Sequence, residues 1–211
     1  MPIILALLLN EIRVKWFKRV TQTLLYLPHF LSWVVIGATA YAMFATNSGV
    51  INTLIANAGK SPIPFLQEDA WWLFSYILIG IWQTMGWGTI IYLAAITNVN
   101  SELYEAAKVD GASRWQQCLH VTLPCIRSAI VVMLIMQLGK LMGGSFERIV
   151  ALSNAKATEY TTTIPVLVFK WFQGNKFSES TALGLFQSVI GVILVVASDK
   201  IAKKLGEDGL L

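Results

Sequence analysis

Four stretches of this sequence are long, strongly apolar and almost free of charge, with Lys140 as their only Asp, Glu, Lys or Arg. A membrane helix needs roughly 17–25 apolar residues to cross the hydrocarbon core. Only 13% of all residues are charged, against about 25% in a soluble globular domain, which excludes an ordinary soluble enzyme. We therefore predict an all-α polytopic transmembrane helical bundle that forms a single domain over residues 1–211. The predicted spans cover about residues 23–46, 72–97, 128–146 and 181–198.

Two of these spans carry residues that disturb a helix. The second is longer than a crossing requires, so we expect it to tilt or to break at Gly80, Gly86 or Gly88. In the first, Pro28 and His29 lie near the start, where a helix tolerates proline best. We interpret His29 as a packing or pore residue.

The basic residues are distributed unevenly over the segments between the spans. Segments 10–22, 98–127 and 200–211 would share one side and hold ten Lys and Arg, against five on the other side. The positive-inside rule assigns the richer group to the cytoplasm, and with it the C-terminus. The net charge of +4 therefore reflects membrane orientation, and we expect no nucleic-acid partner.

Residues 1–9 are apolar but too few to cross a membrane. They end on the predicted cytoplasmic side, which favours the inner end of a helix whose outer part is missing. A signal peptide is the alternative, but the basic n-region and the small-residue cleavage site that it needs do not occur here.

Residues 98–127 form the one long cytoplasmic loop, NVNSELYEAAKVDGASRWQQCLHVTLPCIR. Ser101, followed by two acids, predicts a helix start with Ser101 as its cap. Gly111 interrupts this helix, and a second short helix is predicted over residues 112–120. Pro124 suits the first turn of the next membrane helix.

The predicted helix–turn–helix offers a surface for docking. Ala106, Ala107 and Gly111 are small enough to let another backbone approach, and Glu105 and Asp110 offer charges to a basic partner. The alternative is an amphipathic loop that rests on lipid headgroups.

The same residues resemble a known family. Glu105-Ala106-Ala107, Gly111 six positions after the glutamate, and then Leu123-Pro124 resemble the EAA loop of permease subunits in bacterial binding-protein-dependent ABC importers. Val121 stands where the family has isoleucine. The resemblance continues through the stretches YLPHFLSWVV, GWGTIIYLAAI, ELYEAAKVDGAS and ALGLFQSVIGVILV, and is greatest to oligosaccharide importers of the maltose and polysaccharide-lipoprotein type.

This resemblance implies a type I importer permease fold (MetI-like) in the bacterial inner membrane, truncated at the N-terminus. It implies a transport subunit without catalytic residues, cofactor or metal, because a partner ABC ATPase dimer binds and hydrolyses ATP. The other implied partners are a second, different permease subunit and an extracytoplasmic solute-binding lipoprotein that delivers the sugar. The residues implied in coupling to the ATPase are Glu105, Ala106, Ala107, Asp110, Gly111, Leu123 and Pro124.

A polar stripe is predicted on the third span, where Gln137, Lys140, Gly144 and Glu147 fall three or four residues apart. A lysine near the bilayer centre costs about 3 kcal/mol, so the stripe is predicted to line the translocation path or its outer gate. The alternative is that Lys140 snorkels to the outer surface.

Gln83, Trp87 and Tyr92 on the second span and Gln187 on the fourth are candidates for sugar recognition through hydrogen bonds and ring stacking. Aromatic residues are also common as interfacial anchors, which is the competing interpretation. The segment 144–177, which contains Thr158 and Thr161 to Thr163, is predicted to meet the binding protein.

Two rival functions follow from the sequence. A secondary transporter coupled to an ion gradient is disfavoured because no acidic residue lies within a span, where such coupling needs one. The other rival is a truncated, non-functional membrane fragment. Cys118 and Cys125 have no spacing typical of a zinc site or a disulfide framework, so we interpret them as unpaired packing residues.

Overall fold

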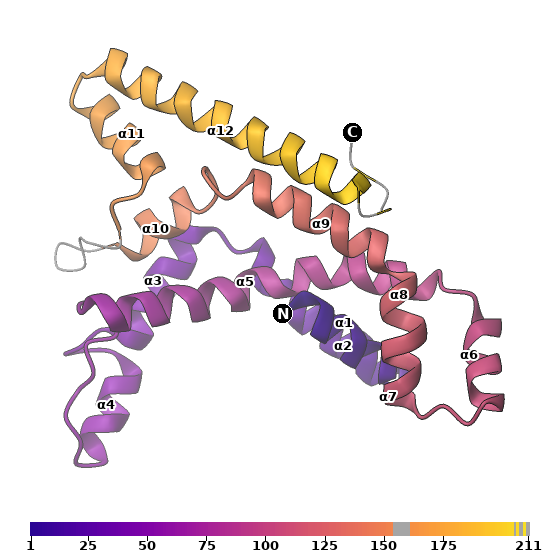
Figure 1. Ribbon diagram of the computed structural model, residues 1–211. Coiled ribbons are helices and arrows are strands. Elements are labelled where there is room, and N and C mark those ends of the chain that lie inside the picture. Colours follow the sequence, from indigo (N-terminus) through magenta and orange to yellow (C-terminus); the bar gives the residue numbers. More distant parts are fainter. Residues whose placement is uncertain (154–160, 205, 207–208, 210–211) are drawn as a thin grey trace. The chain divides into compact units, whose positions relative to one another are not determined.

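The computed structural model describes residues 1–153, 161–204, 206 and 209, and all regular elements in these ranges are helical (Figure 1). This confirms the predicted all-α class. A 3₁₀ turn covers Leu27–Phe30 and a π-helical turn covers Cys118–Thr122. The α-helices are α1 (Pro2–Glu11), α2 (Lys15–Tyr26), α3 (Trp33–Phe44), α4 (Val50–Asn57), α5 (Asp69–Thr97), α6 (Ser101–Val109), α7 (Arg114–Gln117), α8 (Leu123–Cys125), α9 (Arg127–Gly139), α10 (Phe146–Leu152), α11 (Ile164–Gln173) and α12 (Phe177–Lys204).

Two helices, α5 and α12, are each long and apolar enough to cross a membrane. Two bent helix pairs are α2 with α3 and the segment Arg114–Cys125 with α9. If each pair counts as one span, the described residues hold up to four spans. These four segments correspond in order to the four predicted spans, although their boundaries differ.

The first predicted span is not one helix. Helix α2 ends at Tyr26, the 3₁₀ turn follows, and α3 begins only after Ser32, whose hydroxyl accepts the Val35 N–H at 3.4 Å. Pro28 has no N–H to continue an α-helical ladder, so the chain tightens into a 3₁₀ turn and starts a new, capped helix. The prediction of a continuous helix over residues 23–46 was wrong.

The third predicted span ends early. Helix α9 stops at Gly139, and α10 begins at Phe146 after Ser145, whose φ of 94° lies in the left-handed region. Glycines at 139, 143 and 144 weaken a helix here because glycine has low helix propensity. The prediction of one helix over residues 128–146 was therefore wrong. The polar stripe predicted on that helix cannot form on a single helical face.

The second predicted span is one continuous helix, α5, and does not break at its glycines. These glycines permit close packing instead. A Cβ on Gly86 would collide with the backbone carbonyl of Leu25, and one on Gly88 would lie 2.8 Å from the ring of Pro2. Small residues that let backbones approach are typical of membrane helix interfaces.

The chain divides into two compact units, and α5 and α12 contribute to both. Unit 1 comprises Met1–His29, Thr84–Gly139 and Val192–Leu211, and unit 2 comprises Phe30–Gln83 and Lys140–Gly191. The core of unit 1 consists of Ala6, Leu9, Tyr92, Leu93, Ile96 and Ile126. The core of unit 2 consists of Ile36, Ala40, Trp72, Ile79 and Leu152.

Candidate functional site

Helix α6 is the first limb of the predicted docking loop, and its cap lies one residue earlier than predicted. The cap is Asn100, whose side-chain oxygen accepts the Glu102 N–H at 3.0 Å and whose amide donates to the Glu102 carboxylate at 3.1 Å. Ser101 is the first helical residue, so the predicted cap was wrong by one position, while the predicted helix is present. The acidic side chain in the first turn is favourable beside the positive end of the helix dipole.

The turn after α6 has the hydrogen bonds of a Schellman motif. Gly111 has a φ of +78°, its N–H donates to the Lys108 carbonyl at 3.0 Å, and the Ala112 N–H donates to the Ala107 carbonyl at 2.8 Å. Both bonds satisfy carbonyls that the helix end would leave without a partner. The left-handed conformation explains why glycine occupies this position.

The second limb starts with a capping box. Ser113 Oγ accepts the Gln116 N–H at 3.3 Å, and Gln116 Oε1 accepts the Ser113 N–H at 2.7 Å. The limb then widens into the π-helical turn just before Pro124. Proline lacks an N–H and crowds the carbonyl four residues earlier, which a local π-turn accommodates.

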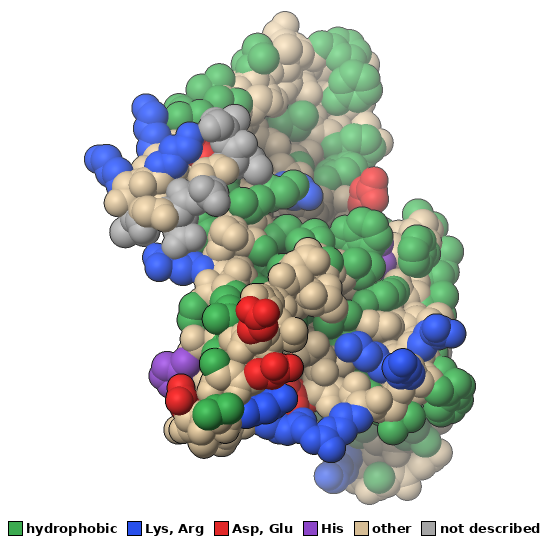
Figure 2. All heavy atoms as spheres, turned by 90° about the vertical axis from the view of Figure 1, so that its right-hand side faces the viewer, with side chains coloured by type: hydrophobic (Ala, Val, Ile, Leu, Met, Phe, Trp, Pro, Cys, Tyr) green, Lys and Arg blue, Asp and Glu red, His purple; other side chains and the backbone are tan. Residues whose placement is uncertain are grey.

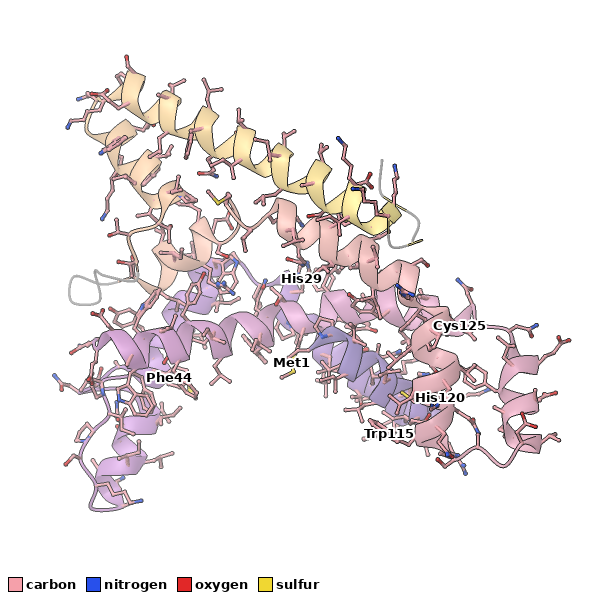
Figure 3. The ribbon with its side chains drawn as sticks, viewed as in Figure 1. Met1, His29, Phe44, Trp115, His120 and Cys125 are labelled. Carbon is pink, nitrogen blue, oxygen red and sulfur yellow. The ribbon has the colours of Figure 1, made fainter. Side chains whose placement is uncertain are left out.

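The second limb continues to Cys125 and is followed by a bend of 62° before α9. Pro124 therefore lies before the bend. The prediction that it occupies the first turn of the membrane helix was wrong for α9. Figure 3 labels Trp115, His120 and Cys125 along this limb. The observed unit is thus α6, a tight turn, and a second helical limb, which we call the α6–α8 hairpin (residues 101–125).

A side-chain bond joins the two limbs of the hairpin. Tyr104 on α6 and Thr122 on the second limb share a hydrogen bond of 2.9 Å between their hydroxyls, and Thr122 is buried. Near the turn the limbs enclose a hollow of about 310 Å³. Its lining residues are Ala107, Asp110, Gly111, Ala112, Gln116, Gln117, His120 and Val121.

The hairpin leaves most of its predicted docking residues at the surface. Glu105, Ala106, Asp110 and Gly111 are exposed, and so is Pro124, while Ala107 is half-buried. Acidic and basic side chains lie together on the face of the molecule seen in Figure 2. In the described part of the chain, Glu105 and Asp110 take part in no ion pair.

Two further contacts attach the hairpin to the rest of unit 1. Leu123, which was predicted to belong to the docking surface, packs against the unit 1 core. Arg114 forms an ion pair of 2.6 Å with Glu11 of α1, but both side chains are more than half exposed, so the pair contributes little stability.

The residues predicted to form a polar stripe are separated by the end of α9. Gln137 lies in its last turn, Lys140 follows its end, and Glu147 is on α10. All three are exposed. The structure therefore gives these residues no common helical face.

The other substrate-path candidates occupy three different environments. Gln83 is buried on α5, whereas Trp87, almost half exposed, stacks on His29 with ring centroids 4.7 Å apart. The interpretation of His29 as a packing or pore residue stays a prediction, since stacking on Trp87 fits both roles. Gln187 on α12 holds its amide against Gly143, where a Cβ would lie 2.8 Å from the amide nitrogen.

Sequence reasoning missed a cluster around Arg148 in unit 2. The Arg148 guanidinium donates to the Tyr76 hydroxyl at 2.6 Å and to Ser145 Oγ at 3.2 Å. Its central carbon lies 3.9 Å from the centre of the Tyr76 ring and 5.8 Å from that of Trp33. A Cβ on Gly80 would collide with the same guanidinium. The sequence signal, an arginine after a glycine-rich loop, was counted only as a charge between spans.

Comparison with known proteins identifies the family. The family model for the binding-protein-dependent transport system inner membrane component matches residues 1–205. The chain belongs to this family. It is 46% identical over 210 residues to the polygalacturonan/rhamnogalacturonan transport system permease protein YteP of Bacillus subtilis (strain 168), and 40% identical over 210 residues to protein LplB of the same organism. Each match covers 99% of this chain.

The chain spans 65% of the length of YteP and 66% of that of LplB. A solved structure with the same fold belongs to a bacterial alginate ABC transporter in complex with an alginate pentasaccharide-bound periplasmic protein. The match has a TM-score of 0.95 at 34% identity and covers 99% of this chain and 73% of that chain. The importer permease fold expected from the EAA resemblance is thereby confirmed.

Proposed function

We propose that this chain is a transmembrane permease subunit of an ATP-driven, binding-protein-dependent importer of oligosaccharides. The observation that carries the proposal is the α6–α8 hairpin, which presents Glu105, Ala106 and Asp110 outward in a chain of this family. In this proposal the hairpin inserts into a cleft of a separate ATPase subunit, and closure of the ATPase dimer on ATP moves it.

The construction of the hairpin suits it to transmit force. Its helix ends are satisfied by its own atoms through the Asn100 cap, the Schellman turn and the capping box, so docking need not order the backbone first. The contact between Tyr104 and Thr122 couples the limbs, and Leu123 connects them to the core that α5 shares. A displacement of the hairpin would thus reach the membrane helices.

The proposed cargo and partners follow from the relatives. YteP is named for polygalacturonan and rhamnogalacturonan transport, and the solved transporter for alginate, so an oligosaccharide delivered by an extracytoplasmic binding protein is the cargo that we propose. Only 6% of the apolar window of α12 is buried, against 39% for α5. This exposed face would serve contact with lipid and with a second, different permease subunit.

The test of the coupling proposal is recovery of the ATPase with the assembled importer. Replacing Glu105 and Gly111 together by alanine should abolish ATPase recovery, because the first change removes a docking charge and the second strains the turn. The matched control replaces Glu68 and Gly59, an exposed acid and another glycine of positive φ, in unit 2. Unchanged recovery in the hairpin variant would contradict the proposal.

The proposed orientation has its own test. A single cysteine at Val109, which is 89% exposed, should react with a membrane-impermeant maleimide only after the cells are opened, and one at Lys60 should react in intact cells. Cys118 and Cys125 are replaced beforehand. Labelling of position 109 in intact cells would place the hairpin outside and overturn the proposal.

A further inference from the structure

We propose that Arg148 recognises the carboxylate of an acidic sugar on the translocation path, so that the substrates are oligosaccharides that contain uronate units. This inference rests on the proposed function, because it assigns a substrate class to the same importer. It concerns unit 2 alone, and specifically the Arg148 cluster, which we define as Arg148, Tyr76, Ser145, Trp33 and Gly80.

The location of the cluster is the first argument. Gly80, which contacts the guanidinium, lies well inside α5, roughly 16 Å along the helix from Asp69 and roughly 25 Å from Thr97. Arg148 therefore lies beside the apolar part of a helix long enough to cross the membrane. A charged side chain at such a depth is costly and typically marks a substrate or ion pathway.

The second argument is that the charge has no counter-ion among the residues that the structure describes. None of the ion pairs in the described part of the chain involves Arg148, and its neighbours are the Tyr76 phenol, the Ser145 hydroxyl and the Trp33 ring. Within the same described residues, the buried Nε of Arg148 has no hydrogen-bond acceptor. An acidic ligand would supply the missing charge.

The third argument is that the surroundings hold the guanidinium in place. Tyr76 lies under its plane and accepts a hydrogen bond, and Gly80 leaves the space that the guanidinium occupies. Ser145, which accepts the other bond, has a left-handed φ of 94° that a non-glycine residue rarely adopts. Strained residues of this kind occur at ligand clamps.

Nearby groups fit the rest of a sugar. Sugar rings pack on aromatic faces, and the centre of the Trp33 ring lies 5.8 Å from the central carbon of the guanidinium. The planar guanidinium matches a carboxylate with two parallel hydrogen bonds, which an ammonium group does not. Gln187 lies against the loop that leads to Ser145, and its amide is suited to sugar hydroxyls. A guanidinium, an aromatic ring and an amide are the groups that suit a uronate unit.

The experiment uses the importer assembled with its ATPase and binding protein in proteoliposomes. The probes are a galacturonate trisaccharide and its methyl ester, which has the same length without the charges. We measure the ratio of kcat/KM for acid over ester in stimulated ATPase activity. Arg148→Gln should lower this ratio at least tenfold. Arg148→Lys should restore part of it, because charge returns without the paired geometry.

Two more variants separate recognition from packing. Tyr76→Phe keeps the ring under the guanidinium but removes the hydroxyl, and should lower the ratio about threefold. Lys170→Gln, at an exposed cation on α11, should leave it within twofold. If Arg148→Gln lowers kcat/KM for acid and ester by the same factor, the arginine only joins helices and the inference is overturned.

Direct binding distinguishes failure of this inference from failure of the proposed function. If neither trisaccharide stimulates the wild-type ATPase, the proposed function loses its support. Equilibrium binding of the labelled acid to the solubilised importer still decides the role of Arg148. Binding that is at least tenfold weaker in Arg148→Gln supports the inference, and equal binding overturns it.

Discussion

The α6–α8 hairpin and the Arg148 cluster are both polar, but they are built in opposite ways. The hairpin keeps its shape through backbone caps, and its acids at 105 and 110 point outward without an ion pair in the described part of the chain. The cluster keeps its shape through side chains that bind one another across α3, α5 and α10. Exposed acids such as Glu105 and Asp110 are solvated by water, whereas the half-buried charge of Arg148 is held by neighbouring side chains.

The hairpin and the Arg148 cluster each contain one residue with a left-handed backbone conformation, and these two residues differ in the same way as the regions do. In the hairpin the position is Gly111, which adopts φ of +78° without steric cost. In the cluster it is Ser145, for which the conformation is unfavourable. A serine is useful there because its hydroxyl accepts a hydrogen bond from Arg148.

The largest effect on the free energy of unfolding is expected when a buried tryptophan of unit 2 is compared with an exposed tryptophan of the hairpin. Trp72 is 1% exposed and donates to the Leu152 carbonyl at 2.7 Å, so Trp72→Ala should lower the free energy of unfolding by about 3–5 kcal/mol. Trp115, 69% exposed on the hairpin, should change it by no more than about 0.5 kcal/mol. Denaturant unfolding of the solubilised protein measures both. Equal losses would mean that the hairpin is as tightly packed as the core.

The next effect tests the turn of the hairpin. Gly111→Ala places a Cβ on a left-handed residue with open space around it, so only backbone strain of about 1–2 kcal/mol is added. Gly59→Ala adds the same strain at φ of +74° in unit 2. Both should lose similar stability, and only Gly111→Ala should reduce the ATPase activity stimulated by the binding protein. A similar reduction of ATPase activity in Gly111→Ala and Gly59→Ala would show that backbone strain lowers activity wherever it occurs in the chain.

A smaller effect is expected at Gly80. Alanine there displaces the guanidinium, which can yield because it ends a flexible side chain, so we expect about 1 kcal/mol less stability and a lower acid-to-ester ratio. Gly184→Ala, in open space on α12, should raise stability by up to about 1 kcal/mol. Thermal unfolding measures both changes, as a lower Tm for Gly80→Ala and a higher Tm for Gly184→Ala. A gain of stability in both variants would mean that the cluster is loosely held.

The smallest effect concerns the ion pair that joins the hairpin to α1. Glu11→Gln removes the partner of Arg114, but both side chains are more than half exposed, so the loss should be about 0–1 kcal/mol. High salt should reduce even this difference, because it screens exposed charges. Unfolding measured at low and high salt tests this. A loss that persists at high salt would indicate packing in place of charge attraction.

Much of the fold was predictable because its causes are local. Long apolar stretches predict membrane-length helices, and α5 and α12 contain the predicted ranges 72–97 and 181–198. The glycine in the docking loop predicts its turn, since only glycine adopts a left-handed conformation freely. Each of these signals acts within a few neighbouring residues, so the sequence can be interpreted without knowledge of the packing.

The sequence by itself therefore determined the helical class, the number of apolar segments and the presence of the hairpin. The breaks in the first and third segments also have local causes, in Pro28 and in the glycines at 139, 143 and 144, although the predicted spans overlooked them. Only the tertiary structure decided that Arg148 meets Tyr76, 72 residues away. Helix propensity and hydrophobic pattern are properties of a segment, whereas the contacts of a half-buried charge such as Arg148 depend on which segments pack together. For that reason the hairpin was predicted from residue order, and the arginine cluster was seen only in the fold.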